Sequence, residues 1–531
     1  MGCLPSSASV ELNINNVRCL LHNGGDMWWD LSNSPRYEVP KVTNSALSRN
    51  SSFAASLWIG GVDGGGNLRI AAQTYRQSGN DFFPGPLTAS GGVTDAVCNA
   101  WDKMYKVNRS ELDDFRSAYN SAMNGGPALN VDLFPAVKSW PAFGENADGE
   151  RIAMAPFIDM DGNPFAYTPS AGDYPDIRPT QGGGEPDQAI WWVINDRGDI
   201  HTQTGGEAIG LEIQMLAFAF QTANAINDMT FYKYRVINKS GAPLFNTFMG
   251  QWVDVDVGNA ADDYVGCDTS RGLGYGYNGD PDDDGSNGYG TNPPAFGMDF
   301  FQGPKDEFGN RLDMTRFVYY QNDASLIGEP GLATDYYGYL KGFWKDGSHM
   351  TFGGNGYAGT TNTNFMFTGD PGGCESMGGW SEVAENNPLG DRRFLQSAGP
   401  FTLQTSAINE IITGAVWARS TQNNNLNSVC ALFKADDLAQ ALFDAQFQLL
   451  DGPDAPILAI EEFDQELVLS WSYNDPLLFN NYNESYAQID PVLASQNEAD
   501  SIFEFQGYIV YQLKDATVSA SELTNTEKAR V

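Results

Sequence analysis

Residues 189–240 contain three apolar segments, AIWWVIND, AIGLEIQMLAFAF and MTFYKYRVINKS, and a fourth, LFNTFMGQWVDVDVG, follows at 244–258. Each segment is rich in β-branched and aromatic residues, and turn residues separate it from the next. This pattern is typical of strands that pair antiparallel along the chain. We therefore expect a mainly β, multidomain protein whose central domain is an antiparallel β-sandwich with a few helices.

The chain continues far enough on both sides of this centre to hold further units. At 531 residues it is longer than one ordinary core requires. Residues 1–150 are expected to form a β-rich region with one helix over about 109–124. Within this region, Ala55–Tyr75 reads as a hairpin around a glycine-rich turn.

Residues 151–452 are expected to form the sandwich domain with long acidic loops rich in glycine and aspartate. The tract at 258–303 is the longest of these loops, and a second helix is expected over Ala435–Leu450. From residue 453 to 531 the strand-like strings ILAIEEFDQELVLSWSY and FQGYIVYQL predict the start of an immunoglobulin-like or fibronectin-III-like module that looks incomplete.

The charge of the chain excludes some classes of partner. Lys and Arg number 30 and Asp and Glu number 67, which gives a net charge of −37. Such a field repels phosphate backbones and anionic membrane surfaces and attracts cations, so we expect no nucleic-acid partner. No apolar run reaches the roughly 18 residues that a membrane-spanning helix needs.

Six cysteines are widely spaced and form no metal-binding spacing: Cys3, Cys19, Cys98, Cys267, Cys374 and Cys430. They allow up to three disulfides in fifteen arrangements, and buried free thiols are equally compatible with the sequence.

Acidic clusters give the clearest candidates for a binding site. In FIDMDGNPFAYTPSAGDYPDI, residues 157–177, the side chains of Asp159, Asp161 and Asn163 alternate around a glycine, and Asp173 follows a short turn. Calcium takes six to eight oxygen ligands from such groups, so we predict a calcium site here.

A second calcium candidate is Asp280, Asp282 and Asp284. Solvated Asp/Gly turns are the alternative at both places. Asp254 and Asp256 share one face of their predicted strand, and we interpret them as the charged edge of a sheet.

Catalytic motifs do not stand out. The three histidines, His22, His201 and His349, lie near no nucleophile elbow, and no phosphate-binding loop occurs. Exposed tryptophans could stack on sugars, but for Trp28–Trp29 and Trp191–Trp192 a buried position is the better interpretation. The sequence therefore indicates no particular enzymatic activity and leaves open whether the protein is an enzyme.

Seven strings spread over nearly the whole chain resemble large secreted proteins of the Bacteroidota that are exported by the type IX secretion system. They are NNVRCLLHNGGDMWWDL, ASLWIGGVDGGGNLRIAAQTYRQSGNDFFPGPL, FIDMDGNPFAYTPSAGDYP, MGQWVDVDVGNAADDYVGCDTSRGLGYGYNGD, NPPAFGMDFFQGP, GDRRFLQSAGPFTL and FQGYIVYQLKDATVSASEL. The resemblance implies an extracellular or cell-surface protein whose biochemical role is largely unassigned. No signal peptide is visible before Ser6 and no sorting domain after Val531, so we expect a mature or processed fragment.

Three functions agree with these observations. The first is a calcium-stabilised structural or adhesive surface protein that assembles with itself or with other surface proteins. The second is a protein that binds or cleaves extracellular glycans. The third is a passive scaffold that carries a further C-terminal module. The first is our prediction, because β-rich units, high acidity and the lack of catalytic motifs all favour it.

Overall fold

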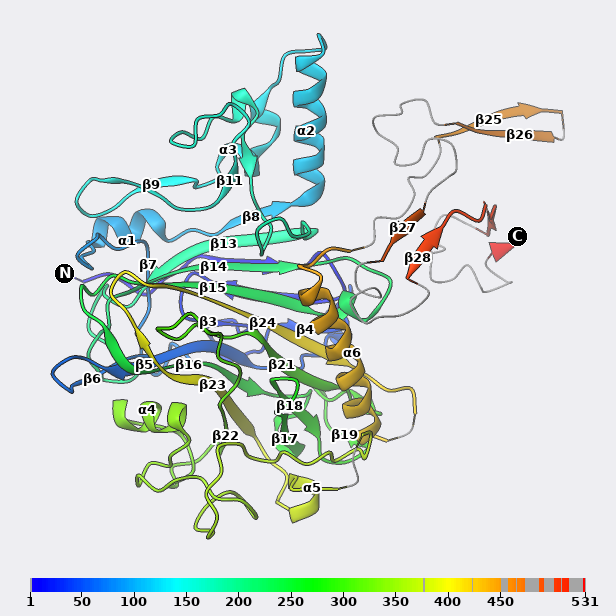
Figure 1. Ribbon diagram of the computed structural model, residues 1–531. Coiled ribbons are helices and arrows are strands. Elements are labelled where there is room, and N and C mark those ends of the chain that lie inside the picture. Colours follow the sequence, from blue (N-terminus) through cyan, green and yellow to red (C-terminus); the bar gives the residue numbers. More distant parts are fainter. Residues whose placement is uncertain are drawn as a thin grey trace. The chain divides into compact units, whose positions relative to one another are not determined.

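The apolar centre of the chain forms three consecutive strands of one antiparallel sheet: β13 (Gln188–Asn195), β14 (Leu211–Ala219) and β15 (Thr230–Asn238) (Figure 1). Every residue of β13 and β14 is buried. Their side chains alternate between two covered faces, which explains why the sequence shows a continuous apolar run instead of an apolar and polar alternation.

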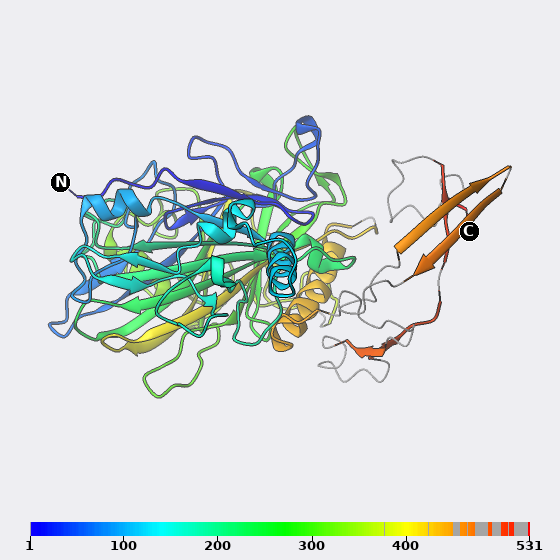
Figure 2. The ribbon, with the colours of Figure 1, turned by 90° about the horizontal axis from the view of Figure 1, so that it is seen from above.

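The two adjacent tryptophans of β13 illustrate this arrangement. Trp192 belongs to the main core, whereas Trp191 points to the opposite face, where its ring lies 6.3 Å from that of Trp101 and 6.4 Å from that of Trp140. Figure 2 shows helix α2 (Arg109–Met123) lying over this outer face. Trp28 and Trp29 are fully buried as well, so the prediction that these tryptophans are core residues is confirmed.

The computed structural model describes residues 2–375, 378–422, 424–449, 457–464, 466–472, 487–490, 501–507, 509–514 and 529–530. The chain divides into two units, Met1–Phe443 and Asp444–Val531.

The first unit contains two large antiparallel sheets, so the prediction of a mainly β protein is confirmed. The strands of the first sheet, in spatial order, are β1 (Ser9–Leu12), β2 (Arg18–His22), β3 (Asp26–Met27), β5 (Ala54–Val62), β16 (Leu244–Val255), β23 (Arg392–Leu403) and β22 (Arg316–Gln321), with β4 (Tyr37–Glu38) on β2 and β6 (Leu68–Ala71) on β5.

The second sheet has the order β17 (Asp263–Asp268), β18 (Leu273–Asn278), β21 (Ala295–Gln302), β24 (Ile408–Ala418), β15, β14, β13 and β7 (Phe83–Pro84), with β8 (Tyr105–Asn108) also on β13. Both sheets combine strands from the predicted regions 1–150 and 151–452. Small pairs complete the unit: β9 (Phe143–Glu145) with β10 (Arg151–Ala153), β11 (Phe157–Ile158) with β12 (Tyr174–Pro175), and β19 (Asp282–Asp283) with β20 (Gly290–Thr291).

The core lies between the two sheets. Tyr234 on β15 donates a hydrogen bond of 2.9 Å to the amide oxygen of Gln251 on β16, which joins the facing strands. Trp28 donates its indole N–H to the hydroxyl of Tyr232 at 2.9 Å. Because each buried polar tip of these large rings has a partner, the rings add apolar area to the core without the cost of an unsatisfied donor.

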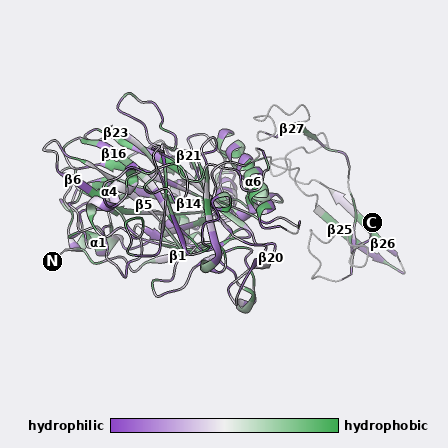
Figure 3. Ribbon diagram, turned by 90° about the horizontal axis from the view of Figure 1, so that it is seen from below, coloured by the Kyte–Doolittle hydropathy of each residue, from purple (hydrophilic) through white to green (hydrophobic). Residues whose placement is uncertain are grey.

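Helices cover the outer faces. They are α1 (Asp95–Trp101), α2, α3 (Pro135–Lys138), α4 (Ala333–Lys341), α5 (Glu382–Glu385) and α6 (Leu426–Asp444), with short 3₁₀ turns η1 (Ser45–Leu47), η2 (Val131–Leu133), η3 (Pro169–Ala171), η4 (Ala225–Asp228) and η5 (Ala260–Asp262). Figure 3 shows both apolar and polar residues along α6. Its apolar face packs on the second sheet, where Phe433 contacts Tyr275 at 5.4 Å between ring centroids.

Several predicted elements can be compared directly with the structure. The helix at 109–124 and the hairpin at Ala55–Tyr75 are confirmed as α2 and as the β5–β6 pair. The helix predicted over Ala435–Leu450 begins at Leu426 and ends at Asp444. The tract at 258–303 is not one long loop, because its interleaved aromatic residues form β17, β18 and β21.

The second unit shows three antiparallel pairs among its described residues: β25 (Ile457–Phe463) with β26 (Glu466–Ser472), β27 (Ala487–Ile489) with β28 (Ile502–Glu504), and β29 (Gln512–Leu513) with β30 (Ala529–Arg530). No immunoglobulin-like or fibronectin-III-like module is identified among the described residues of this unit. Much of the string FQGYIVYQL lies in this described part, at residues 505–507 and 509–513, where β29 is its one strand.

Two disulfides join distant parts of the first unit. Cys3 bonds to Cys98, and Cys374 bonds to Cys430, while Cys19 and Cys267 are buried free thiols. Disulfides are typical of proteins that fold in oxidising, extracellular compartments. No helix in the described part of the chain is both long and apolar enough to span a membrane.

Candidate metal site

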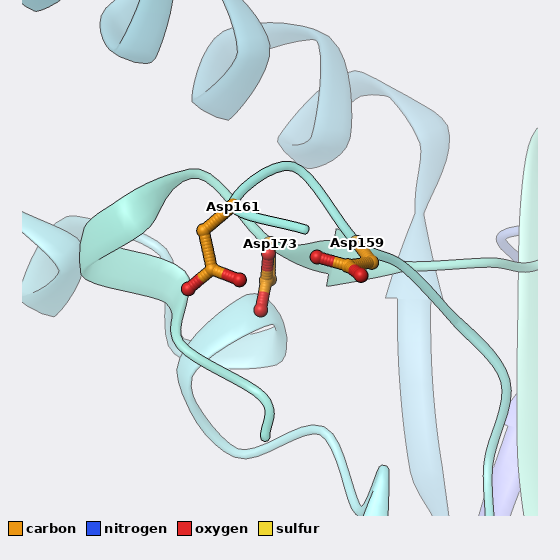
Figure 4. Close-up of side chains that lie close together, drawn as sticks. All are labelled: Asp159, Asp161 and Asp173. Carbon is orange, nitrogen blue, oxygen red and sulfur yellow. The ribbon is translucent and has the colours of Figure 1, made fainter. Parts of the chain in front are cut away.

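Three of the predicted calcium ligands meet in one loop of the first unit. The loop connects β11 to β12, whose register places Ile158 opposite Tyr174. Continuing that register by one position places Asp159 opposite Asp173. One carboxylate oxygen of each of three residues, Asp159, Asp161 and Asp173, lies within 4.8 Å of the other two. Figure 4 shows these three side chains close together.

Backbone amides hold all three carboxylates in place, and Asp161 Oδ1 accepts from the amide of Asn163 at 2.9 Å. Asp159 Oδ1 accepts hydrogen bonds from the amides of Gly162 at 2.7 Å and Asn163 at 3.0 Å. Asp173 accepts from Met160 at 2.9 Å and from Thr168 at 2.7 Å, one bond to each oxygen. These bonds fix the direction of the carboxylates, and the remaining lone pairs stay available for a cation.

Exposure differs among the three carboxylates. Asp173 is fully buried, Asp159 is half-buried and Asp161 is exposed. None of the three forms an ion pair with a described basic residue. Burial, together with the charge of Asp173, raises the pKa of the neighbouring Tyr167 hydroxyl. The loop thus concentrates negative charge that no described side chain neutralises.

The remaining predicted ligand of this stretch is Asn163, whose side-chain oxygen accepts a long bond of 3.4 Å from the Phe165 amide. Asp176 instead forms an ion pair of 2.7 Å with Arg178. The three carboxylates can therefore hold a metal ion, with carbonyl oxygens or water needed to complete a calcium shell.

The second predicted site has a different geometry. Asp280, Asp282 and Asp284 form no group of converging carboxylates in the described chain. The buried residue is Asp283, which accepts amide hydrogen bonds from Tyr289 at 2.6 Å and Asn259 at 3.1 Å. Burial raises its pKa to about 6. Because successive side chains of a strand point to opposite faces, burying Asp283 leaves Asp282 and Asp284 exposed.

A second group of three acids consists of Asp254, Asp256 and Asp391. The sequence indicates the first two as neighbours on one face of a strand, but not Asp391. β16 pairs with β23 so that Val255 lies opposite Arg392. Continuing that register by one position places Asp256 opposite Asp391. The interpretation of Asp254 and Asp256 as a charged sheet edge is wrong, because β16 lies between β5 and β23.

An arginine already forms ion pairs with two of the three acids in this second group. Arg393 forms ion pairs with Asp254 and with Glu329, both at 3.2 Å, and also with Asp391. Burial raises the pKa of Asp254 to about 6, and the positive charge of Arg393 opposes that rise. The group is therefore a buried charge network, and the loop at Asp159–Asp173 is the better candidate for a metal.

The histidines are engaged with the backbone. Both ring nitrogens of His201 lie within hydrogen-bond distance of carbonyl oxygens, 2.8 Å from that of Ile70 and 2.7 Å from that of Asp196. His22 Nε2 lies 2.7 Å from the carbonyl oxygen of Trp29. These two rings serve structural roles in the core.

Comparisons with known proteins find no protein-family model and no curated protein that matches this chain. The site must therefore be interpreted from its own geometry.

Proposed function

We propose that this protein is an extracellular structural or adhesive protein whose 157–177 loop is stiffened by calcium. The observation that carries the proposal is the meeting of Asp159, Asp161 and Asp173 in a loop with no described neutralising cation. A doubly charged ion with oxygen ligands would relieve that repulsion. Burial of Asp173 supports a fixed site over a solvated turn.

Extracellular location is part of the proposal. The two disulfides support it, because such bonds persist in oxidising compartments. The resemblance to type IX secreted proteins of the Bacteroidota supports attachment at the cell surface. We further propose that residues 453–531 begin an immunoglobulin-like or fibronectin-III-like module, supported by the antiparallel pair β25–β26.

Partners of a surface protein are expected to be further copies of itself or other surface proteins. The glycan alternative receives no support from the tryptophans, because Trp28, Trp29, Trp191 and Trp192 are all buried and cannot stack on a sugar.

Thermal unfolding with calcium, with magnesium and with a chelator tests the metal proposal. Calcium at 100 times its dissociation constant would add about 2.7 kcal/mol, which raises the midpoint by about 3 °C for a unit of this size. Asp161→Asn keeps the oxygen that accepts from Asn163 but removes one charge, and we expect it to abolish the rise.

Asp306→Asn is the matched control for this experiment. Asp306 also caps a glycine turn, accepting from Phe308 at 2.9 Å and Asn310 at 2.8 Å, but it belongs to no group of converging acids. The control should retain the full calcium response. An unchanged midpoint in wild type with calcium, or an equal loss in both variants, would contradict the site.

A further inference from the structure

A cavity of about 330 Å³ opens on the first unit where the start of β16 meets helix α4. We call it the α4 cavity. Its lining is mainly apolar, with three aromatic rings and two basic side chains: Phe248, Tyr337, Phe343, Arg316 and Lys341. This combination is unusual in a chain with more than twice as many acidic as basic residues.

Both cations lie against the rings. Lys341 Nζ is 4.4 Å from the centroid of Tyr337 and 5.4 Å from that of Phe343. The Arg316 guanidinium carbon is 5.8 Å from the centroid of Phe248. Such contacts orient the charges but leave their N–H donors free for an oxygen ligand.

Few of those donors are used inside the protein. Arg316 donates Nε–H to the carbonyl oxygen of Lys341 at 3.0 Å and Nη1–H to that of Thr315 at 2.7 Å. No acceptor in the described chain bonds to Arg316 Nη2 or to Lys341 Nζ, and no described carboxylate forms an ion pair with either residue.

The electrostatics agree with a site for an anion. Both side chains are half-buried, and burial alone lowers the pKa of Arg316 and that of Lys341. Elsewhere the cost of such burial is offset by an acid, as for Lys106, where Glu11 opposes the lowering of the pKa. The α4 cavity therefore carries positive charge that the chain does not compensate.

The backbone beside the cavity also departs from regular strand geometry. The register of β16 against β5 shifts between Phe245 and Phe248, which marks a bulge. Within it, Asn246 has a φ of +48°, and its carbonyl oxygen accepts the Tyr337 hydroxyl at 2.7 Å. Bulges re-aim side chains and are frequent next to binding sites.

We propose that the α4 cavity binds a small organic anion, one carboxylate carried on an apolar body. The carboxylate would accept from Lys341 Nζ and Arg316 Nη2, and the body would contact Phe248 and Phe343. A sugar acid fits less well, because the mainly apolar lining offers few partners for several hydroxyl groups. This inference does not depend on calcium.

Calorimetric titration of the whole chain with 3-phenylpropionate tests the proposal, with 3-phenylpropionamide and glucuronate as comparisons. We expect saturable binding of the acid, and binding of the amide weaker by about tenfold or more, because the amide lacks the charge. Saturable binding of glucuronate without 3-phenylpropionate, or equal binding of acid and amide, would overturn the proposed ligand class. This comparison needs no variant.

Lys341→Met then locates the site, because it keeps the length of the side chain and removes the charge. Affinity for 3-phenylpropionate should fall about tenfold. Lys434→Met, which removes the charge of an exposed lysine on α6, is the matched control and should leave the affinity unchanged. Equal losses in the two variants would show attraction by net charge alone and would refute the site.

Discussion

Glu382 is a buried acid whose charge is neutralised inside the protein. The carboxylate of Glu382 on α5 is fully buried and forms an ion pair of 3.1 Å with Arg392, whose side chain is 3% exposed. The same carboxylate accepts the amide of Val265 at 2.9 Å. One acid thus joins a short helix to strands of both large sheets, because β17 and β23 belong to different sheets.

We expect Glu382→Gln to lower the free energy of unfolding of the first unit by about 3–5 kcal/mol, because it leaves the buried Arg392 charge unpaired. Urea unfolding followed by tryptophan fluorescence measures this change. The control is Asp132→Asn, which breaks the exposed Lys138–Asp132 pair, with side chains 61% and 73% exposed, and should cost less than about 1 kcal/mol. Equal losses of unfolding free energy in the two variants would show that the buried Glu382 pair stabilises the protein no more than an exposed pair.

At the level of elements, the sequence predicts local structure better than pairing. The strands at 188–255, the β5–β6 hairpin and α2 follow from patterns within a few residues of each other. The pairing of β5 with β16 joins residues that are far apart in the chain, and no local pattern encodes it. The sequence therefore did not predict that Asp254 lies in a sheet interior beside Arg393.

The candidate metal site was partly predictable for the same reason. Asp159 and Asp161 are close in sequence, so their proximity was expected. Asp173 joins them because β11 and β12 pair, and these two-residue strands are too short for periodicity to reveal. At the second predicted site, the buried residue is Asp283, which lies between the predicted ligands Asp282 and Asp284. Only the observed pairing of β19 with β20 shows which of these acids is buried.

Helix α6 meets the second sheet through two buried carboxyl groups. Asp436 on α6 and Asp299 on β21 interact with each other, and the backbone amide of Phe300 also bonds to Asp299. Two buried carboxyl groups that interact are stable together when they share a proton, and we expect such a proton here. Burial raises the pKa of Asp299 to about 8, and burial together with the charge of Asp299 raises that of Asp436. Asp268 and Asp437 add negative charge nearby, which Arg271 opposes.

This pair predicts a loss of stability as the pH rises. Each carboxyl has an ordinary pKa of 3.8 when unfolded, so below that pH both states are protonated and the stabilisation is complete. Between pH 5 and 8 the folded state keeps a proton that the unfolded state has released. The free energy of unfolding then falls by about 1.4 kcal/mol per pH unit for each such proton.

Asp436→Asn should reduce that contribution, since only Asp299 then titrates at this contact, and burial still raises its pKa. Urea unfolding at pH 5 and pH 8 gives the slope, and the difference between wild type and variant isolates the pair from other titrating groups. Asp114→Asn, at an exposed position of α2, is the control and should keep the wild-type slope. A wild-type slope in Asp436→Asn would refute the shared proton.

Across the whole first unit, chain segments that are distant in sequence are joined in several independent ways. Both sheets mix early and late strands, and the two disulfides close loops of 95 and 56 residues in sequence separation. Loop closure by a covalent bond removes entropy from the unfolded chain and so raises the stability of the folded state. The two buried thiols, Cys19 and Cys267, form no disulfide. Burial raises the pKa of Cys19 to about 12 and that of Cys267 well above its ordinary value.

The connectivity yields a prediction for the whole molecule that the six-cysteine count alone could not give. Alkylation of the denatured, unreduced protein should label two cysteines, Cys19 and Cys267, and alkylation after reduction should label all six, as counted by mass spectrometry.

The double variant Cys374→Ser/Cys430→Ser should lose about 2–4 kcal/mol of unfolding free energy, because its loop is no longer closed in the unfolded state. Cys267→Ala, which removes a free thiol, is the control for loss of sulfur, and its cost should be the same with and without reductant. Four labelled cysteines before reduction, or an unfolding free energy of the wild type that reductant does not change, would show that the disulfides do not contribute as the structure indicates.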